Sequence, residues 1–350
     1  MKPILVRRSQ IPNDCITHIW IERKYGLSEK FKGMPIATSF DTYLKWTVDD
    51  FDPEKSLQSV LEAFKKWGWW GYLSHFKDCK DIISDRTNYY GGFSITCNPD
   101  LPYSVPEQAS TLGEPKANLH DFLLSDFGGK IRLAIEERGL LEEMYHRCFT
   151  GGLVAVRDFL TRHNFIDGTE VFDWNKPFRS QVKPRKNSYF DPYGFRQFTQ
   201  PALYGAHGEF LKNKFKRKIV RSRVACINGR HHDDKIPDYM WHVDEPIFYN
   251  LRLNIPLQTT DNYVFEIKDR FTGKFDVGYG YTWNTEVLHR VYAKRKESSE
   301  RIHMVIGVSP WFDYVPEEDM YISNEFLGEM HPFDMLANNH IIDGLKVARD

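Results

Sequence analysis

The sequence predicts a mainly β core with flanking α-helices and an α-rich N-terminal part. Beyond residue 218, short segments rich in β-branched and aromatic residues alternate with turn residues, as in Thr259-Thr260-Asp261-Asn262. Several short strands at this spacing are typical of an antiparallel sandwich or barrel. Before residue 170, by contrast, apolar residues recur at helical spacing. The segments predicted to be strands are 219–227, 248–257, 263–267, 278–283 and 301–308.

The helical signal is clearest over residues 53–70. Pro53 and Glu54 suit the first turn of a helix, because proline fixes the backbone there and a carboxylate favours the positive end of the helix dipole. An apolar stripe follows at Leu57, Val60, Leu61 and Phe64. Residues 89–96 read as a strand with a glycine break, and the proline-rich stretch 98–118 reads as a loop.

These signals divide the chain into three parts. Residues 1–170 form a mixed α/β N-terminal part, residues 171–314 carry the β core, and residues 315–350 form a polar C-terminal cover. The start of the β core stays open, because strands from before residue 170 can join it.

Composition and charge exclude several classes of protein. The 350 residues carry a formal net charge of −1, which gives no bulk attraction to nucleic acid or to an anionic membrane. No apolar run is long enough to span a bilayer, and the N-terminus lacks the pattern of a secretory signal. Five scattered cysteines without a Cys-x-x-Cys pair indicate neither a disulfide scaffold nor a zinc ribbon. We therefore expect a cytoplasmic protein with no membrane and no nucleic-acid partner.

One ordered set of residues carries chemistry. His242-Val243-Asp244 is a His-x-Asp pair, and residues i and i+2 of a strand point to the same face. A second histidine, His289, follows 45 residues after Asp244 at the end of another β-like segment, and Arg301 opens the next predicted strand. A lone His-x-Asp arises often by chance, whereas the ordered set of His-x-Asp, distant His and strand-opening Arg is far more specific.

Two histidines and one carboxylate form a facial triad that leaves three coordination positions open, the arrangement of non-haem Fe(II) oxygenases. Two open positions suit a bidentate 2-oxo acid and the third suits O₂. The distal carboxylate of such a co-substrate needs a fixed cation, for which arginine is well shaped because its planar guanidinium binds a carboxylate in two places.

The stretch 219–311 resembles the catalytic half of the aspartyl/asparaginyl β-hydroxylase family of Fe(II)- and 2-oxoglutarate-dependent oxygenases. The resemblance covers roughly a quarter of the chain. Its matching stretches are Arg221-Ser222-Arg223-Val224, His242-Val243-Asp244, Leu251-Arg252-Leu253-Asn254-Ile255-Pro256-Leu257, Gly280-Tyr281-Thr282-Trp283-Asn284, His289-Arg290-Val291 and Arg301-Ile302-His303-Met304-Val305-Ile306.

The resemblance implies a double-stranded β-helix, also called a jelly-roll or cupin-like core, and a role for each matching residue. His242, Asp244 and His289 match the metal ligands, and Arg301 matches the arginine that binds the distal carboxylate of 2-oxoglutarate. Arg252 matches the arginine of an Arg-x-His pattern that helps bind the co-substrate. This chain departs from the pattern at Asn254, which replaces the histidine and cannot carry a charge.

The expected function is hydroxylation of a C–H bond in an amino acid or in a peptidyl side chain of Asp, Asn or Pro type, using Fe(II), 2-oxoglutarate and O₂ and releasing succinate and CO₂. Asp244 favours hydroxylation, because related halogenases lack this carboxylate. The alternatives are a non-oxidative cupin-like metal-binding protein, or an isomerase using Zn or Mn on the same scaffold.

Other features are given smaller roles. We expect residues 1–170, including the loop 98–118, to set substrate choice together with the loop 228–240, because segments around a rigid scaffold shape access to it. His231-His232-Asp233-Asp234 cannot converge as one metal cluster, since neighbouring residues of an extended chain face opposite ways. His303 is expected to be a structural, hydrogen-bonded strand residue.

Overall fold

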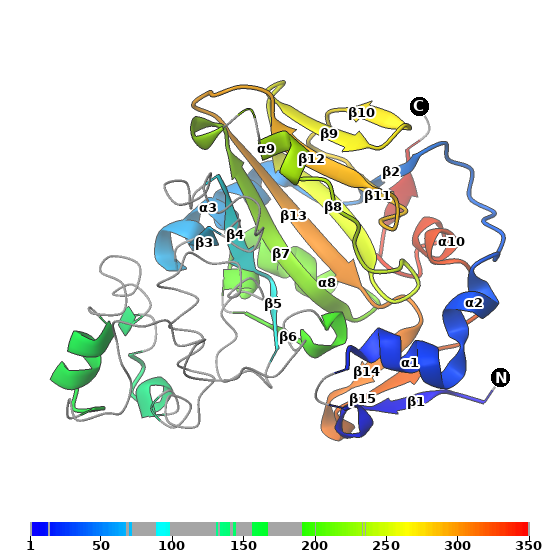
Figure 1. Ribbon diagram of the computed structural model, residues 1–350, viewed down its shortest axis with the longest axis horizontal. Coiled ribbons are helices and arrows are strands. Elements are labelled where there is room, and N and C mark those ends of the chain that lie inside the picture. The colour runs from blue at the N-terminus through cyan, green and yellow to red at the C-terminus, as the bar shows by residue number, and fades with distance from the viewer. Residues whose placement is uncertain are drawn as a thin grey trace.

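The computed structural model of the chain shows a mainly β protein whose sheets are antiparallel (Figure 1). Helices lie on the outside of the sheets. The structure describes residues 2–12, 15–67, 70–71, 89–98, 131, 134–140, 143–144, 156–166, 191–199, 201–232, 234 and 236–348. The predicted loop 98–118, except for its first residue, lies outside the described residues.

An eight-stranded sheet forms the centre of the molecule, with the strand order β16-β2-β11-β8-β13-β7-β4-β3. Its central strands β7 and β13 pair over nearly their whole length, from Glu300 opposite Asn228 to Val308 opposite Ile219. The strands of this sheet are β2 (Tyr43–Val48), β3 (Trp70–Gly71), β4 (Tyr90–Ser94), β7 (Ile219–Asn228), β8 (Leu251–Gln258), β11 (Gly280–Trp283), β13 (Glu300–Val308) and β16 (Leu345–Val347).

One face of this sheet builds the main hydrophobic core. Even-numbered residues of β13 and odd-numbered residues of β8 point into it, as the alternation of a strand requires. The helices α3 (Pro53–Trp67) and α8 (Gly205–Asn213) cover this face through residues such as Val60 and Phe210 (Figure 1). The core residues of the two strands are Ile302, Met304, Ile306, Val308, Leu251, Leu253, Ile255 and Leu257.

The opposite face of the large sheet packs against a small sheet with the order β10-β9-β12. Its strands are β9 (Tyr263–Ile267), β10 (Phe271–Gly273) and β12 (His289–Ala293). On one side of the interface, Tyr281 and Trp283 of β11 pack with Phe265 of β9. On the other side, Ile227 of β7 packs with Ala293 of β12. The space between the two sheets is where the functional residues gather.

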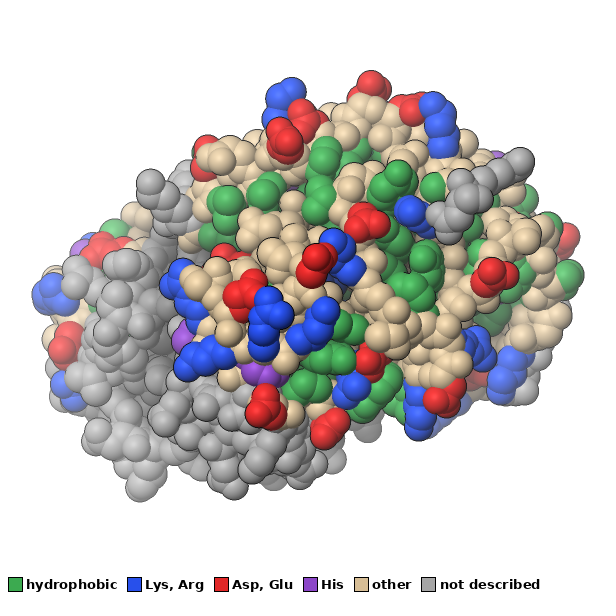
Figure 2. Space-filling view, turned by 90° about the horizontal axis from the view of Figure 1, so that it is seen from above, with side chains coloured by type: hydrophobic (Ala, Val, Ile, Leu, Met, Phe, Trp, Pro, Cys, Tyr) green, Lys and Arg blue, Asp and Glu red, His purple; other side chains and the backbone are tan. Residues whose placement is uncertain are grey.

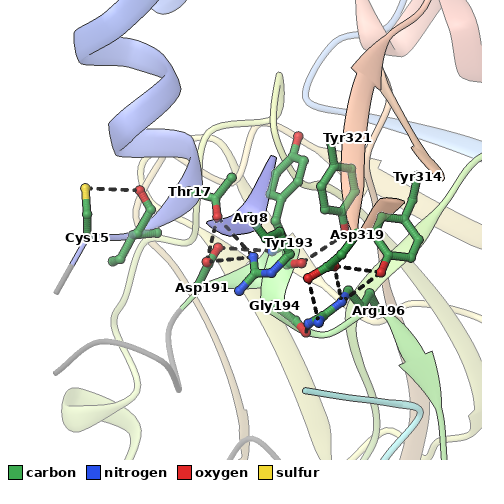
Figure 3. Close-up of polar contacts among 11 residues, drawn as sticks. Arg8, Cys15, Thr17, Asp191, Tyr193, Gly194, Arg196, Tyr314, Asp319 and Tyr321 are labelled. Atoms are coloured by element: carbon green, nitrogen blue, oxygen red, sulfur yellow. Dashed lines mark hydrogen bonds and ion pairs between the residues drawn. The ribbon is translucent and has the colours of Figure 1, made fainter. Parts of the chain in front are cut away.

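A third sheet, with the order β1-β15-β14, ties the N-terminal segment to the C-terminal part. Its strands are β1 (Leu5–Arg7), β14 (Phe312–Val315) and β15 (Met320–Ser323). Beside it, Asp191 accepts hydrogen bonds from Thr17 of helix α1 (Thr17–Tyr25), at 2.7 Å, and from Arg8, at 3.3 Å (Figure 3). Nearby, Arg196 pairs with Asp319 on the same side of this sheet (Figure 3). The remaining elements are α2 (Leu27–Phe31), β5 (Thr96–Cys97), β6 (Gln197–Phe198), α9 (Ile236–Tyr239) and α10 (Pro332–Ala337).

The sequence predicted the β character of the core and most of its strands. The helix expected over 53–70 is confirmed as α3 up to its end at Trp67, whereas Trp70 already belongs to β3, and the segment 219–227 is confirmed as β7. The large sheet also takes strands from all three predicted parts of the chain, because β2 and β4 come from before residue 170 and β16 from after residue 315. Residues 1–170 thus contribute to the core itself.

Charged side chains of both signs lie on the face of the molecule that Figure 2 shows. On the face seen in Figure 2, acidic and basic side chains are interspersed among apolar ones, in keeping with the net charge of −1. Among the described helices, none is both long and apolar enough to cross a bilayer.

Candidate metal centre

Two backbone hydrogen bonds place His242 beside His289. The amide of each residue donates to the carbonyl of the other, with a donor–acceptor distance of 3.0 Å in both cases. Two residues further on, the amide of Asp244 donates to the carbonyl of Thr285 at 2.9 Å, so the carboxylate is held on the same side. One possible ligand atom from each of His242, Asp244 and His289 consequently lies within 4.8 Å of the others.

The backbone also sets which ring nitrogens face inward. Nδ1 of His242 lies 2.7 Å from the carbonyl oxygen of Met240, and Nδ1 of His289 lies 2.8 Å from that of Val287. Because a carbonyl only accepts, each Nδ1 must carry the proton, and each Nε2 keeps its lone pair. Burial lowers the pKa of His242, which favours the neutral form that binds metals. The two histidines are thus preset as Nε2 ligands.

Asp244 stays ionised despite its surroundings. Burial raises the pKa of this carboxyl group, but nearby positive charge, first of all that of the Arg252 guanidinium, outweighs burial and holds the pKa well below its usual range. Nη2 of Arg252 lies 3.7 Å from Oδ1 of Asp244. Two neutral imidazoles and one carboxylate on one side of an ion suit a divalent transition metal such as iron, and they leave its other side open.

A second carboxylate, Glu245, balances the arginines around the triad. It accepts hydrogen bonds from Nη2 of Arg252 at 2.8 Å, from Nη1 of Arg221 at 2.9 Å and from the side-chain Nδ2 of Asn250 at 3.1 Å. Burial raises its pKa, yet the two guanidinium groups lower it to about 2. Glu245 therefore fixes Arg252 beside Asp244. The only indication of this role in the sequence was the position of Glu245 directly after the His-x-Asp pair.

The predicted co-substrate residues all lie on the large-sheet face that packs against the small sheet. Arg252 and Asn254 alternate with the core residues of β8, and Arg301 alternates with those of β13, so their side chains point away from the main core. Arg301 lies opposite Ile227, which packs against the small sheet that carries His289. Arg252 is 1%, Arg301 5% and Asn254 6% exposed, so all three are buried in this space.

Asn254 and Arg252 make different contacts in the structure. Asn254 faces Tyr281 of β11 on one side and Val305 of β13 on the other. Nη2 of Arg252 donates to Glu245, while its Nε and Nη1 are buried and have no hydrogen-bond partner among the residues that the structure describes. Arg252 therefore still has N–H groups that can bind a ligand while its charge stabilises the ionised form of Asp244.

Aromatic side chains close the space beside the triad. The Trp283 ring lies 5.4 Å from the His289 ring, and the Phe265 ring lies 4.5 Å from Trp283. Phe265 itself packs on Phe275, with 4.4 Å between ring centroids. These rings exclude water from one side of the candidate site, which strengthens the electrostatic interactions within it.

Sequence reasoning missed Arg290, which braces the pair of histidines from outside. Its guanidinium lies 4.3 Å above the ring of Trp241, the residue before His242. It also pairs with Glu266 of β9 and donates to the carbonyl of Pro237 at 2.9 Å. The sequence held one indication of this role, because Arg290 directly follows His289 and Trp241 directly precedes His242. The contact between Arg290 and Trp241, however, depends on how the two segments pair.

We expect Arg290→Met to weaken Fe(II) binding about tenfold while leaving the fold intact, because loss of groups behind metal ligands typically costs 10- to 100-fold in affinity. The measurement is an anaerobic Fe(II) titration. Arg295→Met is the matched control, since the Arg295 side chain is 72% exposed and forms an ion pair with Glu297. An unchanged iron affinity in Arg290→Met would show that the histidine pair needs no such brace.

The loop 228–240 lies against the strand of the second histidine. Its helix α9 contacts β12, and Arg290 binds its residues 237 and 238. Nε2 of His232 lies 3.1 Å from Oδ1 of Asp234. Within the described residues, only His242, Asp244 and His289 form a cluster that could hold a metal, and Asp233 lies outside those residues.

Comparison with known proteins adds no relative to this picture, because no protein-family model and no curated protein matches the chain.

Proposed function

We propose that this chain is an Fe(II)- and 2-oxoglutarate-dependent dioxygenase that hydroxylates a C–H bond. The observation that carries the proposal is the His242–Asp244–His289 cluster beside a second, separate cationic residue, Arg301, buried between the same two sheets. A site that only stores a metal has no use for a buried guanidinium facing the same space. A bidentate 2-oxo acid with a distal carboxylate uses both features.

The same arrangement supports the finer proposal that the large and small sheets form a double-stranded β-helix. In such a core, the metal ligands project between two facing sheets from strands near its mouth. Here His289 opens β12 of the small sheet, while Arg301 comes from β13 of the large sheet. Membership in the aspartyl/asparaginyl β-hydroxylase family is part of this proposal and rests on the matching residues. An α-rich character for the N-terminal part is proposed on the sequence pattern.

Each residue has a defined task in the proposed reaction. His242, Asp244 and His289 would hold the iron, Arg301 would bind the distal carboxylate of the co-substrate, and Arg252 would hold Asp244 and offer its remaining donors. When bound, iron with 2-oxoglutarate and O₂ places one oxygen atom in the substrate C–H bond and the other in succinate, with release of CO₂. The aromatic residues around Trp283 would keep bulk water away. An amino acid or a peptidyl side chain of Asp, Asn or Pro type is the proposed substrate, on the resemblance alone.

Anaerobic addition of Fe(II) and 2-oxoglutarate tests this function directly. We expect a weak charge-transfer band in the visible spectrum that needs both components and the intact triad. Admission of O₂ should then convert 2-oxoglutarate to succinate slowly, even without the true substrate. Asp244→Ala should damage this turnover severely.

The alternative functions predict different results in the same experiment. A non-oxidative metal-binding protein, or an isomerase that uses Zn or Mn, would bind metal but yield neither the band nor succinate. Either result would exclude the dioxygenase.

A further inference from the structure

His303 stands out among the buried polar residues of the site, because within the described part of the chain only one nitrogen of its ring has a partner. It follows Arg301 by two residues on β13, points to the same face of the sheet and is 1% exposed. Its neighbours across the sheet are Ala225 on β7 and Pro256 on β8, neither of which has a polar side chain. An apolar residue would fill this place more easily, since burying a polar ring costs free energy unless it is hydrogen-bonded.

The bond to Arg301 fixes where the proton of His303 lies. Nη2 of Arg301 is 2.7 Å from Nδ1 of His303. A guanidinium has only donors, so Nδ1 must accept, and the neutral ring then carries its proton on Nε2. Burial, together with the charge of Arg301, holds the pKa of His303 well below its usual value, so the ring stays neutral. His303 therefore presents an Nε2–H donor, and this atom is buried without a partner in the described residues.

The position of Nε2 shows which part of a ligand it would meet. The two nitrogens of an imidazole point to nearly opposite sides of the ring, so Nε2 points away from Arg301 and from any group that Arg301 holds. Beyond His303, β13 runs on to Gly307, which lies opposite Arg252, and Nη2 of Arg252 lies 3.7 Å from Asp244. Along β13, His303 therefore lies between Arg301 and the part of the strand that is opposite Arg252 and nearest the proposed metal ligands.

We propose that His303 contacts both ends of the bound 2-oxo acid: its Nδ1 orients Arg301 for the distal carboxylate, and its Nε2–H donates to an oxygen of the 1-carboxylate next to the metal. This inference rests on the proposed function. A neutral donor suits the place, because a second cation directly beside Arg301 would be repelled by it. His303 is then a binding residue at one nitrogen and a positioning residue at the other, in contrast to the purely structural role expected from the sequence.

Two substitutions separate the two nitrogens. His303→Asn keeps an acceptor near the place of Nδ1 and removes the Nε2 donor, whereas His303→Gln places an amide near Nε2 and removes the acceptor for Arg301. Two ligands separate the two ends of the co-substrate, namely 2-oxoglutarate and 2-oxobutyrate, which lacks the distal carboxylate. The dissociation constant of each ligand is measured by calorimetry on protein loaded with Zn(II), which prevents turnover.

We expect opposite patterns from the two variants. His303→Asn should weaken both ligands by a similar factor, roughly three- to tenfold, because both possess the 1-carboxylate. His303→Gln should weaken 2-oxoglutarate by a similar factor and leave 2-oxobutyrate within twofold of the unsubstituted protein. His340→Asn, at a histidine that packs against Phe326 outside the site, is the control for histidine loss as such. Zinc affinity should stay unchanged in all three variants.

Other outcomes would overturn the proposal in distinguishable ways. If both variants bind 2-oxoglutarate within twofold of the unsubstituted protein, His303 is structural, whatever happens to the melting temperature. If His303→Asn weakens 2-oxoglutarate alone, Nε2 meets the distal carboxylate and the assignment of the two ends is wrong. If the unsubstituted protein binds neither 2-oxo acid, the proposed function itself fails, and this inference fails with it.

Discussion

Replacement of His242 or His289 by alanine is expected to abolish Fe(II) binding at micromolar metal. Each change leaves one imidazole and one carboxylate, and two protein ligands rarely hold this ion. The backbone hydrogen bonds between the two residues do not involve their side chains, so the histidine pair should keep its place in either variant. The measurement is anaerobic titration with metal analysis after desalting.

The matched control is His340→Ala, which removes a histidine outside the triad. It should bind iron as the unsubstituted protein does. Full retention of iron in both His242→Ala and His289→Ala would mean that the metal binds elsewhere, and the triad would lose its assignment.

Replacement of Arg301 by alanine is expected to raise the 2-oxoglutarate requirement at least about tenfold, because loss of a charge-assisted bidentate contact costs on the order of 1.5–3 kcal/mol. The side chain is 5% exposed, so water cannot readily take over its role. Arg301→Lys should recover only part of the loss, since an ammonium group lacks the planar pair of donors. Zinc-loaded protein and succinate formation give two independent measurements.

The affinity for iron is the control in this experiment, because none of the contacts that the structure describes joins Arg301 to His242, Asp244 or His289. Arg301→Ala should bind Fe(II) normally. If Arg301→Ala leaves the 2-oxoglutarate requirement unchanged, the residue proposed to bind the distal carboxylate becomes Arg252. Its Nε and Nη1 have no partner within the described residues.

The triad was within reach of sequence reasoning because its elements are local or ordered along the chain. His-x-Asp needs only the alternation of an extended segment, Arg301 opens a predicted strand, and His289 follows the predicted strand 278–283. The structure brings the three proposed ligands together as that order predicted. The α3 helix was equally accessible, because its apolar stripe repeats within 15 residues.

The residues that support the triad were beyond such reasoning, because their partners come from other strands. Arg290 gains its role from Trp241 only when two distant segments pair. Glu245 gains its role from Arg221, which lies two strands away from Arg252 in the sheet. His303 was expected to be a bonded strand residue, and it does bond to Arg301, but the buried second nitrogen appears only once Ala225 and Pro256 are known to flank it.

The place of β2 in the large sheet has a consequence for synthesis of the protein. Trp46 donates its indole N–H to Thr282, 236 residues later in the chain, and the strands that pair with β2 in the described part of the chain are β11 and β16. At roughly 5–20 residues per second on the ribosome, β2 waits on the order of 10–50 s for its neighbour. During that time a strand edge and a large indole ring stay exposed on the nascent chain. We expect chaperones that bind such segments to raise the yield of soluble protein, and Trp46→Ala to lower it by removing a partner that the finished sheet needs.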